Sequence, residues 1–340
     1  MKKNVWFTFV MGLAFVFAGS TFAQAEKITL TLSHEYPEYA WGSVHALQPW
    51  VKQVIIASRG QVQFQISSNQ ILSKGEDNWN AVKTGFADMG VCFHGYWSGM
   101  TSLADVISLP ALPFERAEKG SEVLWKLYEM FPSIQRQFEE NHVLLLYTSR
   151  PYTLITTKKR VKTREDMKGL KIRVTEGLPA EQIRAMGATP ILIPISEAYS
   201  SMQKGIIDGM GAPYEVILRL RLHEVAKYYT EVPFPADYFS VVMNKDKWNS
   251  LPQKVKDAIA SVSGLEGSKF WGRNFFDTAK NGLFQKAGVE INFYSLPGVE
   301  RDRWREIGGE PLWNQWVRGM MEREHSNAQD VLNRALDMLK

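Results

Sequence analysis

The sequence predicts an α/β protein of two lobes, each a mostly parallel sheet flanked by helices. Apolar or alternating segments of strand length recur along the chain, and segments with apolar residues at helical spacing separate them. This alternation is typical of β-α-β units. The chain has 340 residues, of which 45% are hydrophobic, which is enough to bury the cores of two lobes.

The first 25 residues are expected to be a leader for export that is cleaved from the mature chain. Lys2 and Lys3 form a positive start, residues 5–17 form a short apolar run, and residues 23–25 have the small-x-small pattern of a cleavage site. The apolar run is too short for a comfortable membrane span. Cleavage after Ala25 leaves 340 − 25 = 315 residues.

The first lobe begins at residues 27–33, which alternate as a half-buried strand. The pattern continues as a helix, a strand, a short helix and a strand over residues 39–58, 61–67, 77–84 and 87–93. Ligands of parallel sheets bind beyond the carboxyl ends of the strands. Three loops are therefore expected to face a ligand, at residues 34–36, 68–70 and 94–97.

The second lobe begins near Tyr147. Its predicted elements are strands at residues 143–147, 154–157, 169–174, 189–193 and 206–210, a turn at 161–167, and helices at 177–186 and 196–204. Pro233 and Pro235 mark a crossover, after which residues 238–243 return to the first lobe as a strand.

A helical pattern of unusual length covers residues 252–287. Its four glycines, at positions 264, 267, 272 and 282, allow the helix to bend as it runs between the lobes. We therefore expect lobe I to comprise residues 26–147 and about 237–275, and lobe II to comprise residues 148–236 and about 276–340.

Arg173 is the residue whose position most suggests a binding function. Residues 170, 172 and 174 are apolar and alternate with Lys171 and Arg173, so a guanidinium stands in a half-buried strand. Its planar fork of donors suits a carboxylate. The strand alone leaves two partners open, an anionic ligand and an internal Asp or Glu.

The charge of the chain argues against polyanionic partners. The formal net charge is 40 − 36 = +4, and loss of Lys2 and Lys3 with the leader lowers it to +2. No long basic run indicates nucleic acid or anionic lipid, and no later apolar stretch approaches a membrane span, so a nucleic-acid ligand and a membrane-embedded protein are not expected. Cys92 is the only cysteine, which excludes an intramolecular disulfide and leaves an inert core thiol as the expected state.

Enzyme and cofactor motifs are missing from the sequence. It contains neither a Gly-x-Ser-x-Gly elbow nor a His-Glu-x-x-His helix, and its six histidines lack close ligand spacing. Residues 209–211 are no dinucleotide fingerprint, because a third glycine is lacking. We therefore expect a non-enzymatic protein without a metal or other cofactor.

Four sequence blocks resemble the solute-binding proteins of tripartite ATP-independent periplasmic (TRAP) transporters, of the dicarboxylate-binding DctP type. The blocks are NQIL at residues 69–72 followed by WNAVKTGFADM at 79–89, TREDMKGLKIRV at 163–174, MQKGIIDG at 202–209, and NKDKWNSLP at 244–252. Their order and spacing, rather than any one block, carry the resemblance.

The resemblance implies a two-lobed periplasmic-binding-protein fold, hinged, with a long helix spanning both lobes. It also implies that the protein resides in the periplasm, encloses a small organic carboxylate and delivers it to a membrane permease of small and large subunits, driven by an ion gradient. A periplasmic sensor or adaptor that reports the ligand to a receptor would use the same cleft and remains an alternative.

The resemblance assigns roles to two arginines. Arg173 matches the family arginine that pairs with the substrate carboxylate. Arg150 matches a second family arginine about twenty residues earlier, and two interpretations stay open for it, a ligand contact and a brace for the crossover strand.

One departure from the family pattern bears on the ligand. Where the family often has Gln-Glu-Asn-Pro after its Asp-Gly, with an Asn that contacts the ligand, this chain has Met-Gly-Ala-Pro at residues 210–213, and Ala212 offers no side-chain hydrogen bond. We therefore favour an aromatic or apolar monocarboxylate, such as an aryl or indole acid, over a C4-dicarboxylate or a sugar acid. The candidate ligand-binding residues are Arg173, Arg150, Tyr36, Asn69, Trp97, Tyr214, Ala212 and Tyr238, with Trp41 as a further aromatic near the cleft.

Overall fold

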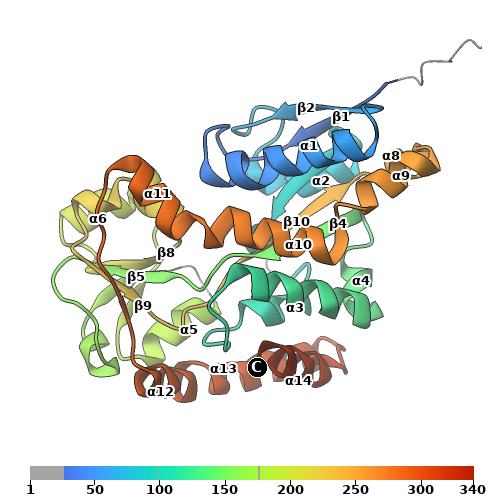
Figure 1. Cartoon of the computed structure of the whole chain (residues 1–340). Coiled ribbons are helices and arrows are strands. Elements are labelled where there is room, and N and C mark those ends of the chain that lie inside the picture. Colours follow the sequence, from blue (N-terminus) through green and yellow to red (C-terminus); the bar gives the residue numbers. More distant parts are fainter. Residues whose placement is uncertain (1–26, 98, 175–176) are drawn as a thin grey trace, which may run out of the picture.

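The computed structural model describes residues 27–97, 99–174 and 177–340, and it contains two mixed sheets with helices on their faces (Figure 1). The predicted leader lies outside the described residues. The strands are β1 Ile28–Ser33, β2 Val62–Ser67, β3 Met89–Phe93, β4 His142–Thr148, β5 Thr153–Thr156, β6 Lys171–Arg173, β7 Thr189–Ile191, β8 Gly209–Ala212, β9 Tyr228–Glu231, β10 Tyr238–Met243 and β11 Phe293–Ser295.

The α-helices follow or precede these strands along the chain. They are α1 Gln48–Ala57, α2 Asn78–Lys83, α3 Ala117–Met130, α4 Pro132–Gln137, α5 Leu178–Ala185, α6 Ala198–Gln203, α7 Tyr214–Arg219, α8 Lys245–Ser250, α9 Gln253–Ala260, α10 Gly264–Gly272, α11 Ala279–Ala287, α12 Gly298–Gly308, α13 Glu310–Glu322 and α14 Ala328–Leu339. Two π-helical segments, η1 Ser43–Leu47 and η8 Arg273–Asp277, precede α1 and follow α10.

Each sheet is parallel except for one strand. Lobe I has the strand order β2-β1-β3-β10-β4, and only β10 runs against the others. Lobe II has the order β11-β9-β5-β8-β6-β7, and only β5 is reversed. The expectation of mostly parallel sheets in two lobes is confirmed.

The two reversed strands belong to the connections between the lobes. The chain leaves lobe I through β4 and enters lobe II as β5, and it returns from β9 to β10. The two connecting segments are hydrogen-bonded to each other, with Ser149 N donating to Asp237 O at 2.8 Å and Tyr152 N to Pro235 O at 3.3 Å. These paired segments connect the two lobes, and we call them the hinge.

The crossover sets the carboxyl ends of the parallel strands of both sheets toward each other. In lobe I, β1, β2, β3 and β4 run the same way, and β4 ends where the crossover begins. In lobe II, Thr153 at the start of β5 is paired with Ala212 at the end of β8 and with Glu231 at the end of β9. A ligand between the lobes therefore meets the carboxyl edge of each sheet, where such sheets bind ligands.

The long helix between the lobes is shorter than the sequence pattern predicts. Helix α9 ends at Ala260, and Ser263 is extended, with φ −111° and ψ −157°. Gly264 then has φ +63°, a left-handed conformation that side chains disfavour. The spanning helix therefore begins at Gly264 and continues through α10, η8 and α11 to the other lobe (Figure 1).

Helices bury both faces of both sheets. In lobe I, α1, α10 and η8 cover one face through Trp50, Trp271 and Phe275, and α2 and α3 lie on the other. In lobe II, α5 and α12 cover one face, and α6, α7 and α11 cover the opposite one. None of the helices among the described residues is long and apolar enough to span a membrane.

The last two helices pack against lobe I. Trp313, Trp316 and Val317 of α13 and Val331 and Leu332 of α14 belong to the same buried cluster as the apolar side chains of α3. Both helices lie beneath α3 in Figure 1. The sequence predicts that residues from about 276 to 340 belong to lobe II. Helices α11 and α12 do pack there, whereas α13 and α14 pack on lobe I, because their apolar faces cover the outer side of α3.

Strand β8 lies later in the sequence than residues 206–210, where a strand was predicted. Ile206 is exposed, and the strand begins at Gly209. A β-carbon on Gly209 would lie 2.2 Å from Ile155 O of the neighbouring strand, so only glycine fits in this central position. The strand therefore begins at the glycine rather than at the two isoleucines before it.

Candidate functional site

Arg173 is the last residue of β6, at the carboxyl edge of the lobe II sheet. Ile172 before it is fully buried, while Arg173 is half-buried, which agrees with the predicted alternation. The guanidinium Nε donates to Ile193 O at 3.1 Å. Among the described residues no carboxylate lies within salt-bridge distance of it, and burial lowers the pKa of Arg173. The guanidinium therefore retains donors for an anion.

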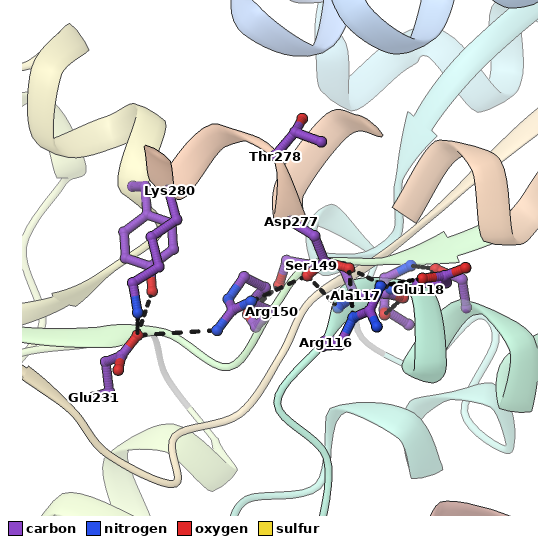
Figure 2. A network of polar contacts seen from close by, with 12 residues as sticks. Arg116, Ala117, Glu118, Ser149, Arg150, Glu231, Asp277, Thr278 and Lys280 are labelled. Atoms are coloured by element: carbon purple, nitrogen blue, oxygen red, sulfur yellow. Dashed lines mark hydrogen bonds and ion pairs between the residues drawn. The ribbon is translucent and has the colours of Figure 1, made fainter. Parts of the chain in front are cut away.

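Arg150 has the opposite surroundings, because two carboxylates flank it (Figure 2). Its Nη1 donates to Asp277 Oδ1 at 3.2 Å, and its Nη2 lies 3.9 Å from Glu231 Oε1. The guanidinium also stands 5.8 Å from the centre of the Tyr214 ring. Arg150 lies in the crossover segment, Glu231 ends β9 and Asp277 ends η8, so these ion pairs join three segments that run between the lobes.

Both carboxylates have further partners that fix their positions. Asp277 accepts hydrogen bonds from the backbone nitrogens of Ala117 at 2.9 Å and Glu118 at 3.0 Å, at the start of α3. Glu231 accepts from Lys280 Nζ at 2.5 Å and from Tyr214 OH at 2.7 Å. Burial alone would raise the pKa of Glu231, but the hydrogen bonds from Lys280, Ser295 and Tyr214 outweigh it and lower the pKa to about 2.

An opening beside Arg150 lies between the hinge and the lobe II edge. It is lined by Arg150, Pro151, Thr153, Pro213, Tyr214, Glu215 and Phe276. Burial raises the pKa of Glu215 to about 7. Burial also raises the pKa of Tyr36 in lobe I, and the charges of Glu35, Tyr147 and Glu215 add to that shift.

The three predicted loops meet at the lobe I edge. Asn69 N donates to Tyr36 O at 2.9 Å, and Gln70 N donates to His34 O at 3.3 Å. The Tyr96 hydroxyl donates to Glu35 Oε2 at 2.6 Å and so joins the third loop to the first. This edge carries His34, 1% exposed and with neither ring nitrogen bonded among the described residues.

The structure brings five of the predicted ligand-binding residues to the facing edges in addition to Arg173. Ala212 is fully buried at the end of β8, Tyr214 and Arg150 line the opening, and Tyr36 is half-buried on the lobe I side. Asn69 is exposed at the same lobe I edge, with φ +56°. Asparagine tolerates that left-handed conformation better than most residues, which gives Asn69 a structural role in the turn.

Three other predicted aromatic residues pack against their own surroundings. Tyr238 is 3% exposed, its ring stacks 4.8 Å from His94, and its hydroxyl donates to Asp105 Oδ1 at 2.7 Å. Trp97 donates from Nε1 to Glu76 O at 2.9 Å. Trp41 donates to Thr278 Oγ1 at 3.0 Å, beside the spanning helix.

The acidic residues of the hinge were missed by the sequence analysis. The sequence around these residues, Asp277, Glu231 and Glu215, has no local motif that predicts a binding site. Asp277 meets Ala117, 160 residues earlier in the chain, only because α3 and η8 are packed together. Arg150 itself could have indicated these acidic residues, because a half-buried arginine needs an oppositely charged partner.

Comparison with known proteins identifies the family model that this chain matches. The model of bacterial extracellular solute-binding protein family 7, DctP, matches residues 35–318. A marine-metagenome TRAP solute-binding protein specific for aromatic acid ligands, solved with 3-hydroxybenzoate, is 25% identical, with a TM-score of 0.81 and coverage of 92% of this chain and 98% of the other.

Two further relatives differ in their ligands. The solved TRAP solute-binding protein of Bordetella bronchiseptica with bound mandelate is 25% identical, with a TM-score of 0.77 and coverage of 92% and 98%. The 2,3-diketo-L-gulonate-binding periplasmic protein YiaO of Escherichia coli is 23% identical over 81% of each chain.

Proposed function

The chain belongs to the DctP family of bacterial extracellular solute-binding proteins, and we propose that it captures an aromatic monocarboxylate between its lobes through Arg173. The family is one of TRAP solute-binding proteins rather than enzymes, in agreement with the expectation from the sequence. The proposal concerns the ligand and the residues that bind it.

The surroundings of Arg173 are the observation that carries the proposal. Arg173 ends β6 at the carboxyl edge of the lobe II sheet, and the described residues supply its guanidinium with no carboxylate partner. A partly buried charge without a counterion is costly unless a ligand completes the pair. Arg150, by contrast, has Asp277 and Glu231 as partners, which favours the interpretation of Arg150 as a brace for the crossover.

The rest of the cleft supports an aromatic body on the carboxylate. Ala212 is fully buried and contributes no side-chain hydrogen bond, while Tyr214, Phe276 and Pro213 supply apolar lining next to it. An aromatic pair contributes about 0.5–1.5 kcal/mol beyond its buried area. The two relatives at 25% identity were solved with 3-hydroxybenzoate and mandelate, both aromatic monocarboxylates.

A thermal-shift screen of carboxylates tests the ligand class. A ligand that binds only the folded protein stabilises it by about 2.7 kcal/mol at a hundredfold excess over Kd. Aryl and indole acids are expected to raise the Tm more than succinate, malate, fumarate or sialic acid. A larger shift with the C4-dicarboxylates or sialic acid would contradict the aromatic ligand, and no shift with any carboxylate would contradict carboxylate capture itself.

We also propose that the chain is exported to the periplasm with cleavage after Ala25 and delivers its ligand to a permease of small and large subunits. The family description as extracellular and the leader pattern of residues 1–25 support export. Mass spectrometry of the periplasmic protein is expected to find an N-terminus at Glu26. Neighbouring genes for permease subunits support transport, and a neighbouring receptor gene would favour a sensor.

A further inference from the structure

The amino edge of the lobe II sheet lies opposite the carboxyl edge described above. Strand β5 is reversed, so its end at Thr156 is paired with Gly209 at the start of β8 and with Tyr228 at the start of β9. Strand β6 also starts at this edge, at Lys171, beside the start of β8. The amino edge therefore brings together the segments just outside these strands, which are residues 157–160, 204–208 and 227.

Backbone hydrogen bonds hold these segments next to one another. Lys227 N donates to Thr156 O at 3.0 Å, and Thr157 N donates to Asp208 O at 2.9 Å. Asp208 N donates in turn to Lys171 O at 2.8 Å. The cations that these segments carry form a surface that we call the basic edge, which comprises Lys158, Lys159, Arg160, Lys171, Lys204 and Lys227.

Asp208 neutralises only part of this charge. Its carboxylate is 7% exposed, and its Oδ1 lies 2.7 Å from Lys158 Nζ. Lys159, Lys204 and Lys227 have no carboxylate within salt-bridge distance among the residues that the structure describes, and Lys204 and Lys227 are exposed. The basic edge therefore presents unpaired cations to its surroundings.

The positive charge is a local feature of this edge. The mature chain is expected to carry a formal charge of only +2, so the cations gathered here are a local excess, even with Glu290, which precedes β11 at the end of the same sheet. The cations come from several segments, which is why the sequence contains no basic run. A surface with such an excess attracts an anionic partner.

An exposed apolar side chain lies within the basic edge. Ile206 is 51% exposed, and the carbonyl just before it accepts a hydrogen bond from Lys171 Nζ at 2.9 Å. Arg160 stands over the rings of Tyr228 at 5.8 Å and Tyr294 at 5.7 Å. Lysine and arginine side chains around apolar and aromatic groups are typical of surfaces that lie in a membrane interface.

This combination decides between the anionic partners. A nucleic-acid backbone or an acidic peptide would pair with the cations but would give the exposed Ile206 side chain no apolar surroundings. An anionic phospholipid surface supplies both, because the headgroup phosphates attract the cations and the acyl boundary beneath them takes up the apolar side chain.

We propose that the basic edge of lobe II binds peripherally to the anionic headgroups of a phospholipid membrane, with Ile206 entering the interface. The inference goes beyond the proposed capture of a carboxylate and does not depend on it, because the basic edge and Arg173 lie at opposite edges of the same sheet. Membrane contact at the basic edge keeps the protein at the membrane surface and leaves the carboxyl edge free.

Co-sedimentation of the chain from Glu26 onward with phospholipid vesicles tests the inference. Vesicles of phosphatidylglycerol are expected to bind the protein more tightly than vesicles of phosphatidylcholine, by about tenfold or more, because each Lys or Arg near an anionic surface strengthens binding about fivefold. Addition of about 1 M NaCl, which shortens the Debye length to about 3 Å, is expected to release most of the bound protein.

A triple variant of the basic edge, Lys159→Gln/Lys204→Gln/Lys227→Gln, removes the unpaired cations. It is expected to bind phosphatidylglycerol vesicles roughly a hundredfold more weakly than the wild type. Ile206→Gln is expected to weaken this binding about fivefold, because a half-exposed isoleucine then no longer enters the interface. Both variants are expected to bind benzoate as the wild type does, which shows that they are folded.

A second triple variant, Lys52→Gln/Lys254→Gln/Arg318→Gln, is the matched control. It removes exposed cations from α1, α9 and α13 and changes the net charge by the same amount. Its binding to phosphatidylglycerol vesicles is expected to stay within about fivefold of the wild type, because its cations lie outside the basic edge.

Equal losses in the two triple variants, or equal binding of the wild type to both kinds of vesicle, would overturn the inference. Unchanged binding of Ile206→Gln would overturn the entry of Ile206 into the interface. If neither kind of vesicle binds the wild type, the inference is wrong, and binding of polyglutamate would then identify the basic edge as a surface for an acidic protein segment. None of these results affects carboxylate capture, which fails only if no carboxylate binds.

Discussion

Arg173 and Arg150 are half-buried arginines at the same cleft. They differ in the groups that surround their guanidiniums. The described residues give Arg173 one backbone acceptor, Ile193 O, whereas Arg150 lies between Asp277 and Glu231. An arginine with its own carboxylates stabilises the fold, while one without them is available to an anionic ligand.

Replacing Arg173 by alanine is expected to weaken binding of benzoate by about 2–5 kcal/mol, because the ligand carboxylate is then buried without its charged partner. Arg173→Lys is expected to restore only part of the affinity, since an ammonium cannot form the two-pronged contact. Isothermal titration calorimetry measures both. The matched control is Arg184→Ala on α5, where an exposed arginine pairs with Glu181; unchanged affinity in Arg173→Ala would refute the assignment.

The Glu231 carboxylate is expected to contribute to stability in a pH-dependent way. Its pKa is lowered from the usual 4.5 to about 2, so the folded state binds the proton less tightly than the unfolded chain. Its stabilising contribution is therefore present above about pH 4.5 and is lost as the pH falls toward 2. In urea unfolding from pH 6 to pH 3, Glu231→Gln is expected to lose less stability than the wild type.

Glu165 provides the control for this pH dependence. Hydrogen bonds from Arg303, aided by a backbone contact, also lower the pKa of Glu165 to about 2, but the pair lies in solvent. Solvent screens exposed ion pairs, so Glu165→Gln is expected to leave the pH dependence nearly unchanged. Equal slopes for Glu231→Gln and the wild type would contradict a role for the buried hinge pairs in stability.

At the scale of the elements, β8 shows why a sequence pattern can place a strand too early. The pattern favoured residues 206–210, which begin with two isoleucines, but the sheet leaves no room for a side chain at Gly209, next to β5. Gly209→Ala is expected to destabilise the protein by about 1–3 kcal/mol, because the new methyl group would lie 2.2 Å from Ile155 O. Chemical denaturation measures this loss.

The control for β8 is Gly298→Ala at the start of α12. A β-carbon there has nothing within 4 Å, and alanine favours a helix over glycine. Its stability is expected to stay within about 1 kcal/mol of the wild type. A similar loss in both variants, or none in Gly209→Ala, would contradict the steric explanation of β8.

The sequence predicted some of the other elements well and others poorly. The difference depends on whether an element follows from a pattern of neighbouring residues. Strands β1 and β2 of lobe I and the strand of Arg173 follow from alternation, which is local and survives in the structure. The start of the spanning helix at Gly264 was not predicted, since the helical pattern of α9 and α10 is nearly continuous and only the backbone of residues 261–264 interrupts it.

The candidate site also has parts that local patterns predict and parts that they do not. An alternating strand and a family block predict the position of Arg173, and the structure places it at the end of β6. The rule that ligands lie at carboxyl edges predicts the three lobe I loops, which meet in the structure. The partners of Arg150 and the packing of α13 and α14 on lobe I depend on contacts between residues far apart in the sequence, such as Arg150 with Asp277, which are 127 apart, and Ala117 with Asp277, which are 160 apart. No local pattern encodes such contacts.

At the scale of the whole molecule, we propose that the two facing edges enclose one anionic ligand through Arg173. The lobes are joined by the paired crossover segments and by the helix from α10 to α11 (Figure 1). A ligand that contacts both edges favours the closed arrangement, whereas a ligand held by one lobe alone has no effect on closure.

Small-angle X-ray scattering of the ligand-stripped protein, with and without saturating benzoate, tests this claim most directly. The wild type is expected to become more compact on adding benzoate, and Arg173→Ala is expected to show no compaction at the same concentration. Identical wild-type curves while calorimetry shows benzoate bound would contradict enclosure between the lobes. Equal compaction of Arg173→Ala and the wild type would contradict capture through Arg173.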